Sequence, residues 1–144
     1  MAADPRLRGH LLRGLCLEMG AVQQYLAQAS LTEMWELADH SRRFRRDGVD
    51  ELNHVERLIQ RMLLLGMTPN AGSIAPVRLG RSVEEMLLID RELEIEAIHA
   101  YDDAARYCVR IGDHETEALF AGLLREELEH LGSIDESLDG IGAS

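Results

Sequence analysis

The sequence predicts an all-α protein, a bundle of four long helices with a long connection between the second and the third. Three observations lead to this fold class. The 144 residues are 46% hydrophobic and only 4% aromatic, and the residues that dominate are those that favour helices. Apolar residues recur at alternating spacings of three and four in four segments, which is typical of helices with one buried face. Just three prolines interrupt the chain. We expect a single domain over residues 1–144.

The first two helices are expected to form one pair. The first begins at Pro5 with Asp4 as its N-cap and ends near Trp35 or Leu37. The second begins between residues 38 and 41 and ends at Gly66, a residue that can cap a helix C-terminus. Their apolar stripes comprise Leu11, Leu15, Val22, Tyr25 and Ala29 in the first helix, and Phe44, Gly48, Val55, Leu58, Met62 and Leu65 in the second.

A second helical pair is expected after an extended connection over residues 67–81. Prolines and glycines punctuate this connection, and at about fifteen residues it is longer than a tight turn requires. A capping box at Ser82–Glu85 starts the third helix at Val83, Gly112 stops it, and Asp113 caps the fourth. Residues 139–144 are expected to be a short flexible tail. The stripes comprise Leu87, Ala97, Tyr101, Ala104, Cys108 and Ile111, then Phe120, Leu123, Leu131, Ile134 and Leu138.

Charge and cysteine content narrow the classes of function. The formal net charge of −11 argues against a nucleic-acid partner, which needs a basic surface, and suits a protein that attracts cations. Cys16 and Cys108 have no paired spacing, which favours a reducing compartment. No signal-peptide core and no apolar run near the ~20 residues of a membrane helix are found, so we expect a cytoplasmic protein without a membrane partner.

Four glutamates occupy positions where the stripes call for apolar residues, one near the middle of each helix. A buried carboxylate without a partner costs several kcal/mol or becomes protonated. Four such groups at one level are tolerable if cations lie among them, and a pair of metal ions is the simplest solution. A single inward glutamate could instead be a surface residue whose phase is misjudged. The four are Glu18, Glu51, Glu94 and Glu127.

Two histidines strengthen the prediction of a metal site. His54 follows Glu51 by three residues and His130 follows Glu127 by three, so each pair lies on one helix face. A single Glu-x-x-His pair on a helix is usually exposed to solvent. Here, however, four residues recur after the same interval of 76 positions: Glu18, Tyr25, Glu51 and His54 recur as Glu94, Tyr101, Glu127 and His130, and Asp50 recurs as Glu126.

Several other polar residues have two open interpretations. The two repeated tyrosines are either core aromatics or hydrogen-bond donors to a ligand. Asp90 either orients a ligating histidine or faces solvent. The cysteines are expected to be small core residues. The remaining histidines are expected at the surface, and they are His10, His40, His99 and His114.

Four segments carry a resemblance to a known family. They are EMGAVQQYL after Leu17, DELNHVERLIQRMLLLGMTPN from Asp50, DRELEIEAIHAYDDAARY from Asp90 and EELEH from Glu126. On these segments the chain resembles bacterioferritin over nearly its whole length. The resemblance implies a ferritin-like four-helix bundle, whose family ligand set is one glutamate from each of two helices and Glu-x-x-His from each of the others. It implies two irons per subunit bridged by Glu51 and Glu127, with Glu18 and His54 completing one iron and Glu94 and His130 the other.

Three departures from the family pattern qualify what the resemblance implies. Leu52 stands where the family usually has a haem-ligating methionine, and because leucine offers no lone pair we expect no haem here. Arg46 replaces a histidine that often lines the inner surface, although Asp50 beside that surface is present. The family usually adds a short fifth helix that lines shell channels, and this sequence ends soon after the fourth.

Three functions follow as hypotheses. The first is a haem-free bacterioferritin-type ferroxidase, in which two Fe(II) are oxidised by O₂ or peroxide and the ferric iron is stored or detoxified. Its assembly is expected to be a homo-oligomer, from a dimer up to a 24-subunit shell, or a mixed shell with a haem-binding paralogue. The second is a non-storing di-iron oxidase or peroxidase that acts as a small oligomer. The third is a structural or adaptor protein with a vestigial core, against which the intact ligand set argues.

Overall fold

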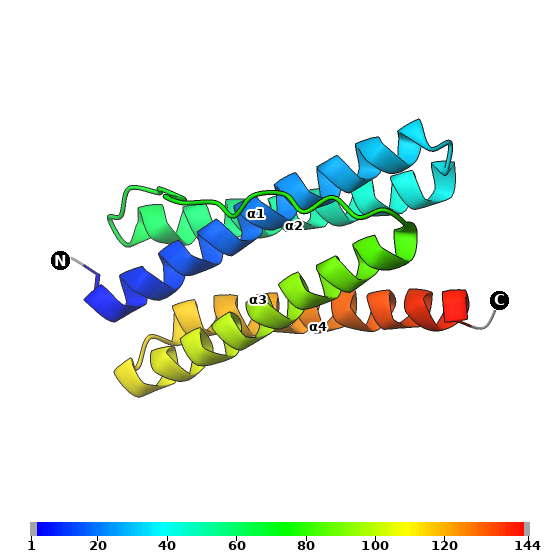
Figure 1. Cartoon of the computed structure of the whole chain (residues 1–144). Helices are drawn as coiled ribbons and strands as arrows, with labels where there is room; N and C mark the ends of the chain where they lie inside the picture. Colours follow the sequence, from blue (N-terminus) through cyan, green and yellow to red (C-terminus); the bar gives the residue numbers. More distant parts are fainter. Residues whose placement is uncertain (1–2, 143–144) are drawn as a thin grey trace.

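The computed structural model of the protein describes residues 3–142, which form four helices arranged as two antiparallel pairs (Figure 1). The helices are α1 (Pro5–Met34), α2 (Ala38–Leu64), α3 (Val83–Ile111) and α4 (His114–Gly142). α1 packs along α2 and α3 along α4, and α1 also packs against α3. The connection over residues 65–82 follows the length of the first pair before α3 begins (Figure 1). The predicted all-α bundle with a long crossover is therefore confirmed.

Local capping interactions fix the helix ends. The Asp4 carboxylate accepts hydrogen bonds from the backbone N–H groups of Arg6 and Leu7, and Pro5 occupies the first helical position. Ser82 accepts one from the N–H of Glu85, while Gly112 ends α3 with a left-handed φ of 74°. These starts and stops agree with the sequence prediction. α1 ends at Met34, slightly earlier than expected, because the chain reverses through Glu36 at a φ of 62°.

The long connection is held against the first helical pair by specific contacts. The Gln24 side chain on α1 donates to the carbonyl of Arg78 at 2.8 Å and accepts from its N–H at 3.0 Å. Near the end of the connection Gly80 is buried beneath Met86. A Cβ added at Gly80 would lie 2.9 Å from the Met86 backbone nitrogen, so the close approach that starts α3 requires glycine here.

The apolar interior consists of two clusters on either side of a polar layer. One cluster includes Leu11, Leu15, Leu58, Phe120 and Leu123. The other includes Tyr25, Ala29, Phe44, Met86 and Ile134. Along every helix the candidate glutamate lies between residues of these two clusters. The fold therefore encloses the carboxylates with apolar residues above and below them.

Three expectations about individual segments are corrected. α4 continues through Gly142, so the predicted tail is helical over residues 139–142, while residues 143 and 144 lie outside the described part. The helix continues because Leu138 and Ile141 pack against the second apolar cluster. Ile111 is 40% exposed rather than buried, since it is the last residue of α3. Among the expected stripe residues, Val22, Leu65, Leu131 and Leu138 are half-buried.

One of the two cysteines is a core residue, as expected, and the other is only partly buried. Both are free; Cys108 is fully buried, and Cys16 is half-buried, where its thiol contacts the carbonyl of Ala71. Burial raises the pKa of the Cys108 thiol to about 11, which keeps it protonated and unreactive. None of the helices in residues 3–142 is both long and apolar enough to cross a bilayer.

Candidate metal centre

The four predicted glutamates meet in the middle of the bundle and are shielded from solvent. Glu18 comes from α1, Glu51 from α2, Glu94 from α3 and Glu127 from α4, and none is more than 1% exposed. Each occupies the inward face of its helix because it continues the apolar stripe of that helix. The inward positions that the stripes predicted are therefore confirmed.

The histidines divide the cluster into two overlapping groups. In each group, one possible ligand atom from every residue lies within 4.8 Å of the others. Glu51 and Glu127 belong to both groups, so these two carboxylates lie between the two positions that a cation could occupy. The first group is Glu18, Glu51, His54 and Glu127, and the second is Glu51, Glu94, Glu127 and His130.

The facing atoms are crowded together without hydrogen bonds. His54 Nδ1 lies 2.8 Å from Glu127 Oε1, and His130 Nδ1 lies 2.8 Å from Glu51 Oε1. With metal–ligand bonds of about 2.1 Å, two ligand atoms at right angles lie about 3.0 Å apart, which is close to these separations. The donor set therefore fits two metal ions. The buried atoms that lack a hydrogen-bond partner include Glu18 Oε2, Glu51 Oε1 and Oε2, His54 Nδ1, Glu94 Oε2, Glu127 Oε1 and His130 Nδ1.

The other ring nitrogen of each histidine faces a carboxylate at the edge of the cluster. His54 Nε2 lies 3.6 Å from Glu126 Oε1, and His130 Nε2 lies 3.4 Å from Asp50 Oδ2. A carboxylate on the far nitrogen is the usual way in which a protein orients a metal-binding histidine. Sequence reasoning missed this placement of Asp50 and Glu126, although the repeat interval of 76 residues had already paired them.

Two buried tyrosines donate to the carboxylates that are not shared. The hydroxyl of Tyr25 lies 2.6 Å from Glu94 Oε1, and that of Tyr101 lies 2.6 Å from Glu18 Oε1. Burial and the neighbouring negative carboxylates raise the pKa of both phenols well above 10. The phenols therefore remain protonated donors. Both interpretations left open by the sequence hold, because the rings belong to the apolar clusters while the hydroxyls contact the candidate ligands.

Without a bound cation the cluster is electrostatically strained. Burial, followed by the charge of a neighbouring carboxylate, raises the pKa of Glu127 to about 8 and that of Glu51 well above its ordinary value. Burial alone would lower the pKa of His54, but its contacts with Glu127, Glu18 and Glu51 outweigh burial and raise it. Positive charge among these buried carboxylates is therefore favourable.

Asp90 has neither of the roles that the sequence left open. It is fully buried, so it does not face solvent, and its Oδ1 accepts a 2.7 Å hydrogen bond from Gln28 rather than from a histidine. Its Oδ2 and the Gln28 Oε1 have no partner. Burial raises the pKa of this carboxyl to about 8, which indicates that the protonated form is held close to neutral pH.

A small polar opening of about 190 Å³ connects the cluster with the surface between α2 and α4. It is lined by Asp50, Asn53, His54, Glu126, Glu129 and His130. Both histidines therefore share this opening with three carboxylates. Two α2 residues that the sequence singled out, Leu52 and Arg46, are exposed, Leu52 by 45%. Neither belongs to the two groups of possible metal ligands.

The other histidines do not join the cluster. His40, His99 and His114 are exposed as expected, and His10 is half-buried at the surface between α1 and α3. In the described part of the chain, the two groups that share Glu51 and Glu127 are the sets of side chains arranged to hold a metal ion. The fold and this site together define a helical bundle with a candidate two-metal carboxylate centre.

Comparison with known proteins identifies the class of this bundle. The model of the ferritin-like domain matches residues 9–142, so the chain belongs to the ferritin-like family. Its sequence is similar to that of curated bacterioferritins. The protein from Brucella melitensis is 30% identical, with 96% of this chain and 86% of that protein covered, and the protein from Streptomyces coelicolor is 32% identical, with 96% and 83% covered.

A solved structure gives the same relationship in three dimensions. The bacterioferritin of Rhodobacter capsulatus, with a metal-free dinuclear site and haem iron in a crystallographic special position, superposes with a TM-score of 0.93. It is 29% identical, and the match covers 96% of this chain and 87% of that chain. The bacterioferritin resemblance inferred from the sequence motifs is therefore confirmed.

Proposed function

We propose that this protein is a bacterioferritin-type ferroxidase that oxidises Fe(II) for iron storage or detoxification. The observation that carries the proposal is the pair of four-residue groups that share Glu51 and Glu127. Hard oxygen ligands with one imidazole per site suit iron. The similarity to bacterioferritins over 96% of the chain supports the same assignment.

In this proposal six residues hold two iron ions. Glu18 and His54 would belong to one site and Glu94 and His130 to the other, with Glu51 and Glu127 available to both. Iron at these sites supplies one-electron redox chemistry. Two Fe(II) together give up two electrons; with two protons these convert O₂ into hydrogen peroxide, or convert hydrogen peroxide into two water molecules.

The surrounding residues have distinct tasks in this function. Tyr25 and Tyr101 hold one oxygen of Glu94 and of Glu18, which leaves Oε2 of each carboxylate for the metal. Asp50 and Glu126 hold the histidine rings from their Nε2 side. The polar opening between α2 and α4 gives Fe(II), as substrate, a path lined with negative charge.

Iron loading distinguishes storage from simple oxidation. The purified protein is stripped of metal, given Fe(II) in air far beyond two ions per chain, and separated by size-exclusion chromatography with iron and protein followed together. Storage predicts that many ions per chain elute with a large assembly. Iron that stops near two per chain on a small oligomer supports the non-storing oxidase instead. Absence of bound iron would contradict the metal centre itself.

The proposal includes the absence of a thioether-ligated haem. The expected ligand position holds Leu52, whose side chain is exposed and carries no sulfur. Addition of haem to the purified protein, followed by absorption spectroscopy, tests this expectation. A stoichiometric haem with methionine ligation would show that the alignment behind it is wrong, whereas recovery of a second related subunit that brings haem would support a mixed assembly.

A further inference from the structure

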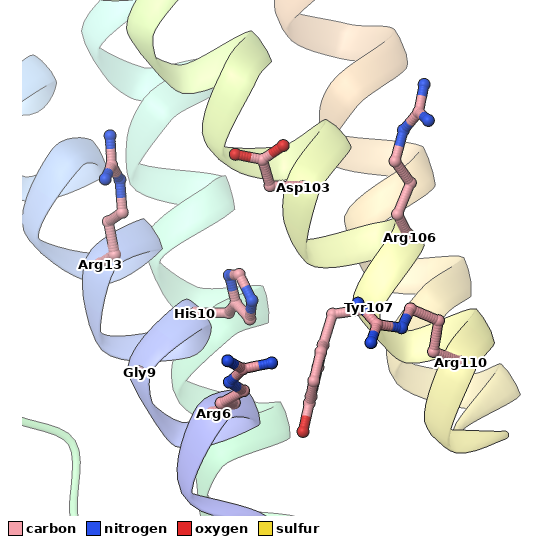
Figure 2. Close-up of a pocket in the computed structure, with 8 residues that line it drawn as sticks. All are labelled: Arg6, Gly9, His10, Arg13, Asp103, Arg106, Tyr107 and Arg110. Carbon is pink, nitrogen blue, oxygen red and sulfur yellow. The ribbon is translucent and has the colours of Figure 1, made fainter.

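A groove rich in arginine lies between the first turns of α1 and the last turns of α3 (Figure 2). None of its lining residues belongs to the carboxylate cluster. Its volume is about 650 Å³. α1 contributes one wall and α3 the other, and the side chains of Arg6, His10 and Tyr107 gather between them (Figure 2). The lining residues are Arg6, Gly9, His10, Arg13, Asp103, Arg106, Tyr107 and Arg110.

The charge of this groove is opposite to that of the protein as a whole. The chain carries a formal charge of −11, yet four arginines and one carboxylate, that of Asp103, line the groove. A second carboxylate, that of Asp4, lies beside the groove and accepts a hydrogen bond from the Tyr107 hydroxyl. Such a concentration of one sign of charge in a concave surface focuses the field on a ligand of the opposite sign. An anion is therefore the kind of ligand that the groove favours.

Two of the four arginines that line the groove form no ion pair within the described part of the protein. Among the described residues no carboxylate oxygen lies within the 4.0 Å ion-pair distance of Arg6 or Arg110. Arg13 reaches Glu96 only at 3.9 Å, with both side chains more than half exposed. Arg106 pairs with Asp102 at 3.1 Å. Two guanidinium groups, one from each wall, are thus available to a ligand.

The available guanidinium groups converge on one aromatic side chain. Arg6 lies over the Tyr107 ring with 6.0 Å between its guanidinium carbon and the ring centroid, and the Arg110 side chain lies beside the same ring from the facing helix (Figure 2). The Tyr107 hydroxyl itself donates to the Asp4 carboxylate. The His10 ring lies 5.4 Å from the Tyr107 ring at a tilt of 39°. Gly9 adds no side chain, and a Cβ there would meet nothing within 4 Å. The groove is therefore open at Gly9, and the guanidinium groups of Arg6 and Arg110 lie on either side of it.

We propose that this groove binds a small anion that carries two or more phosphoryl groups. Guanidinium groups bind phosphate oxygens in bidentate fashion and remain charged at every physiological pH. Because Arg6 and Arg110 come from opposite walls, a chain of phosphoryl groups can engage both, with Arg13 and Arg106 at the rim. The volume is in the range of small-molecule sites. Two sources share this chemistry, an inorganic polyphosphate and a nucleotide.

Calorimetric titration with inorganic tripolyphosphate tests the proposal. The full-length protein is used without added iron, at low and at physiological salt. Wild-type protein is expected to bind saturably, and R6Q/R110Q is expected to bind at least tenfold more weakly. R8Q/R81Q is the matched control, because it removes the same charge from exposed arginines outside the groove, and it should change the affinity less than twofold. The same control also corrects for heat that arises when tripolyphosphate removes residual metal from the protein, because its metal site is unchanged.

Two further probes identify what the groove recognises. Equal binding of tripolyphosphate and ATP indicates that the phosphoryl chain alone is recognised, as for an inorganic polyphosphate, whereas at least tenfold tighter binding of ATP indicates a nucleotide. Orthophosphate should bind at least tenfold more weakly than either. Equal loss of affinity in both double variants, equal affinity for orthophosphate, or no saturable binding would overturn the proposal.

His10 gives a readout at the groove itself. Burial lowers its pKa, as do the charges of Arg13 and Arg6 from α1, while Asp103 on the facing helix raises it, and Arg106, Tyr107 and Arg110 complete that wall. A bound polyphosphate adds negative charge beside this ring, so the His10 pKa should rise when tripolyphosphate saturates the protein. NMR titration of the histidine ring signals measures it. An unchanged His10 pKa in the presence of bound tripolyphosphate would place the ligand elsewhere.

Discussion

The hydroxyl of Tyr101 on α3 donates a 2.6 Å hydrogen bond to Glu18 on α1, across the bundle. Tyr25 on α1 makes the equivalent bond to Glu94 on α3. The two bonds link the same pair of helices in opposite directions, as expected from the interval of 76 residues that separates the two tyrosines and the two glutamates. Each phenol therefore fixes the orientation of a carboxylate that belongs to only one of the two ligand groups.

Replacement of Tyr101 by phenylalanine should weaken metal binding at the site that contains Glu18. The ring still fills its place in the core, but the carboxylate loses the donor that orients it. Loss of such a contact typically costs about 10–100-fold in metal affinity or activity. Titration with Co(II), followed by absorption spectroscopy, measures the affinity. Y107F, which removes a surface phenol bonded to Asp4, is the control and should bind metal like the wild type.

Glu127→Ala should abolish rapid Fe(II) oxidation while the helices persist, because a residue common to both ligand groups is lost. Stopped-flow absorbance measures the oxidation, and circular dichroism measures the helix content. The metal-free variant should be at least as stable as the wild type, since a buried carboxylate of raised pKa has been removed. E136A, an exposed change on the same helix, serves for comparison. Wild-type kinetics in E127A would refute the ligand assignment.

The carboxylates behind the two histidines should act on separate sites. D50A removes the partner of His130 Nε2 and E126A that of His54 Nε2. Each variant should weaken binding of one of two metal ions by about 10–100-fold and leave the other nearly unchanged. Calorimetric titration with Co(II) resolves the two events. Equal weakening of both sites in each variant would argue against this division of roles.

Because of the raised pKa of Asp90, we expect the stability of the metal-free protein to depend on pH. Its pKa is about 8 in the folded state against an ordinary value of 3.8, so the folded state holds the proton more tightly. The free energy of unfolding should therefore fall as the pH rises from about 4 to about 8. D90N lacks this titration, and its amide supplies a donor near the unpartnered Gln28 Oε1.

The stability advantage of D90N over the wild type should accordingly grow with pH across that window, by an amount on the order of several kcal/mol. Urea unfolding at a series of pH values measures it. D139N, an exposed substitution on α4, should show a nearly constant difference from the wild type. A constant difference for D90N as well would show that Asp90 ionises normally.

Gly80 should tolerate alanine poorly although its backbone is not left-handed. The added Cβ would meet the Met86 backbone nitrogen at 2.9 Å and Met86 Cγ at 2.8 Å, so the start of α3 must shift, at a cost of about 1–3 kcal/mol. Gly132 in α4 provides the opposite case, because nothing lies within 4 Å of its added Cβ. Thermal unfolding should show G80A destabilised and G132A stabilised by about 0.5–1 kcal/mol.

The helices and the inward glutamates were predictable because the sequence patterns that indicate them lie within a few residues or within one helix. Asp4, Ser82 and Gly112 act on the backbone within a few residues, and the periodicity of each stripe fixes which face is buried. The extent of α4 was not predictable in the same way. Glycines at its end favour a break, but Ile141 packs against the second apolar cluster, and this packing overrides the local preference.

The neighbours of the ligands were harder to predict than the ligands. Periodicity places His54 and His130 on inward faces, but it does not determine which ring nitrogen faces Glu126 or Asp50, because that depends on side-chain rotation. The partner of Asp90 is Gln28 on another helix. This contact depends on the axial offset between the two packed helices. The arginine groove likewise joins residues 6–13 with residues 103–110, which are far apart in the sequence, and leaves no local pattern.

The central claim is that six side chains hold two iron ions bridged by Glu51 and Glu127. Anomalous diffraction at the iron absorption edge, from crystals soaked in Fe(II), tests it directly. We predict two peaks in each chain, one among Glu18, His54 and the shared glutamates, and the other among Glu94, His130 and the same glutamates. A single peak, or iron bound only elsewhere in the protein, would contradict the claim.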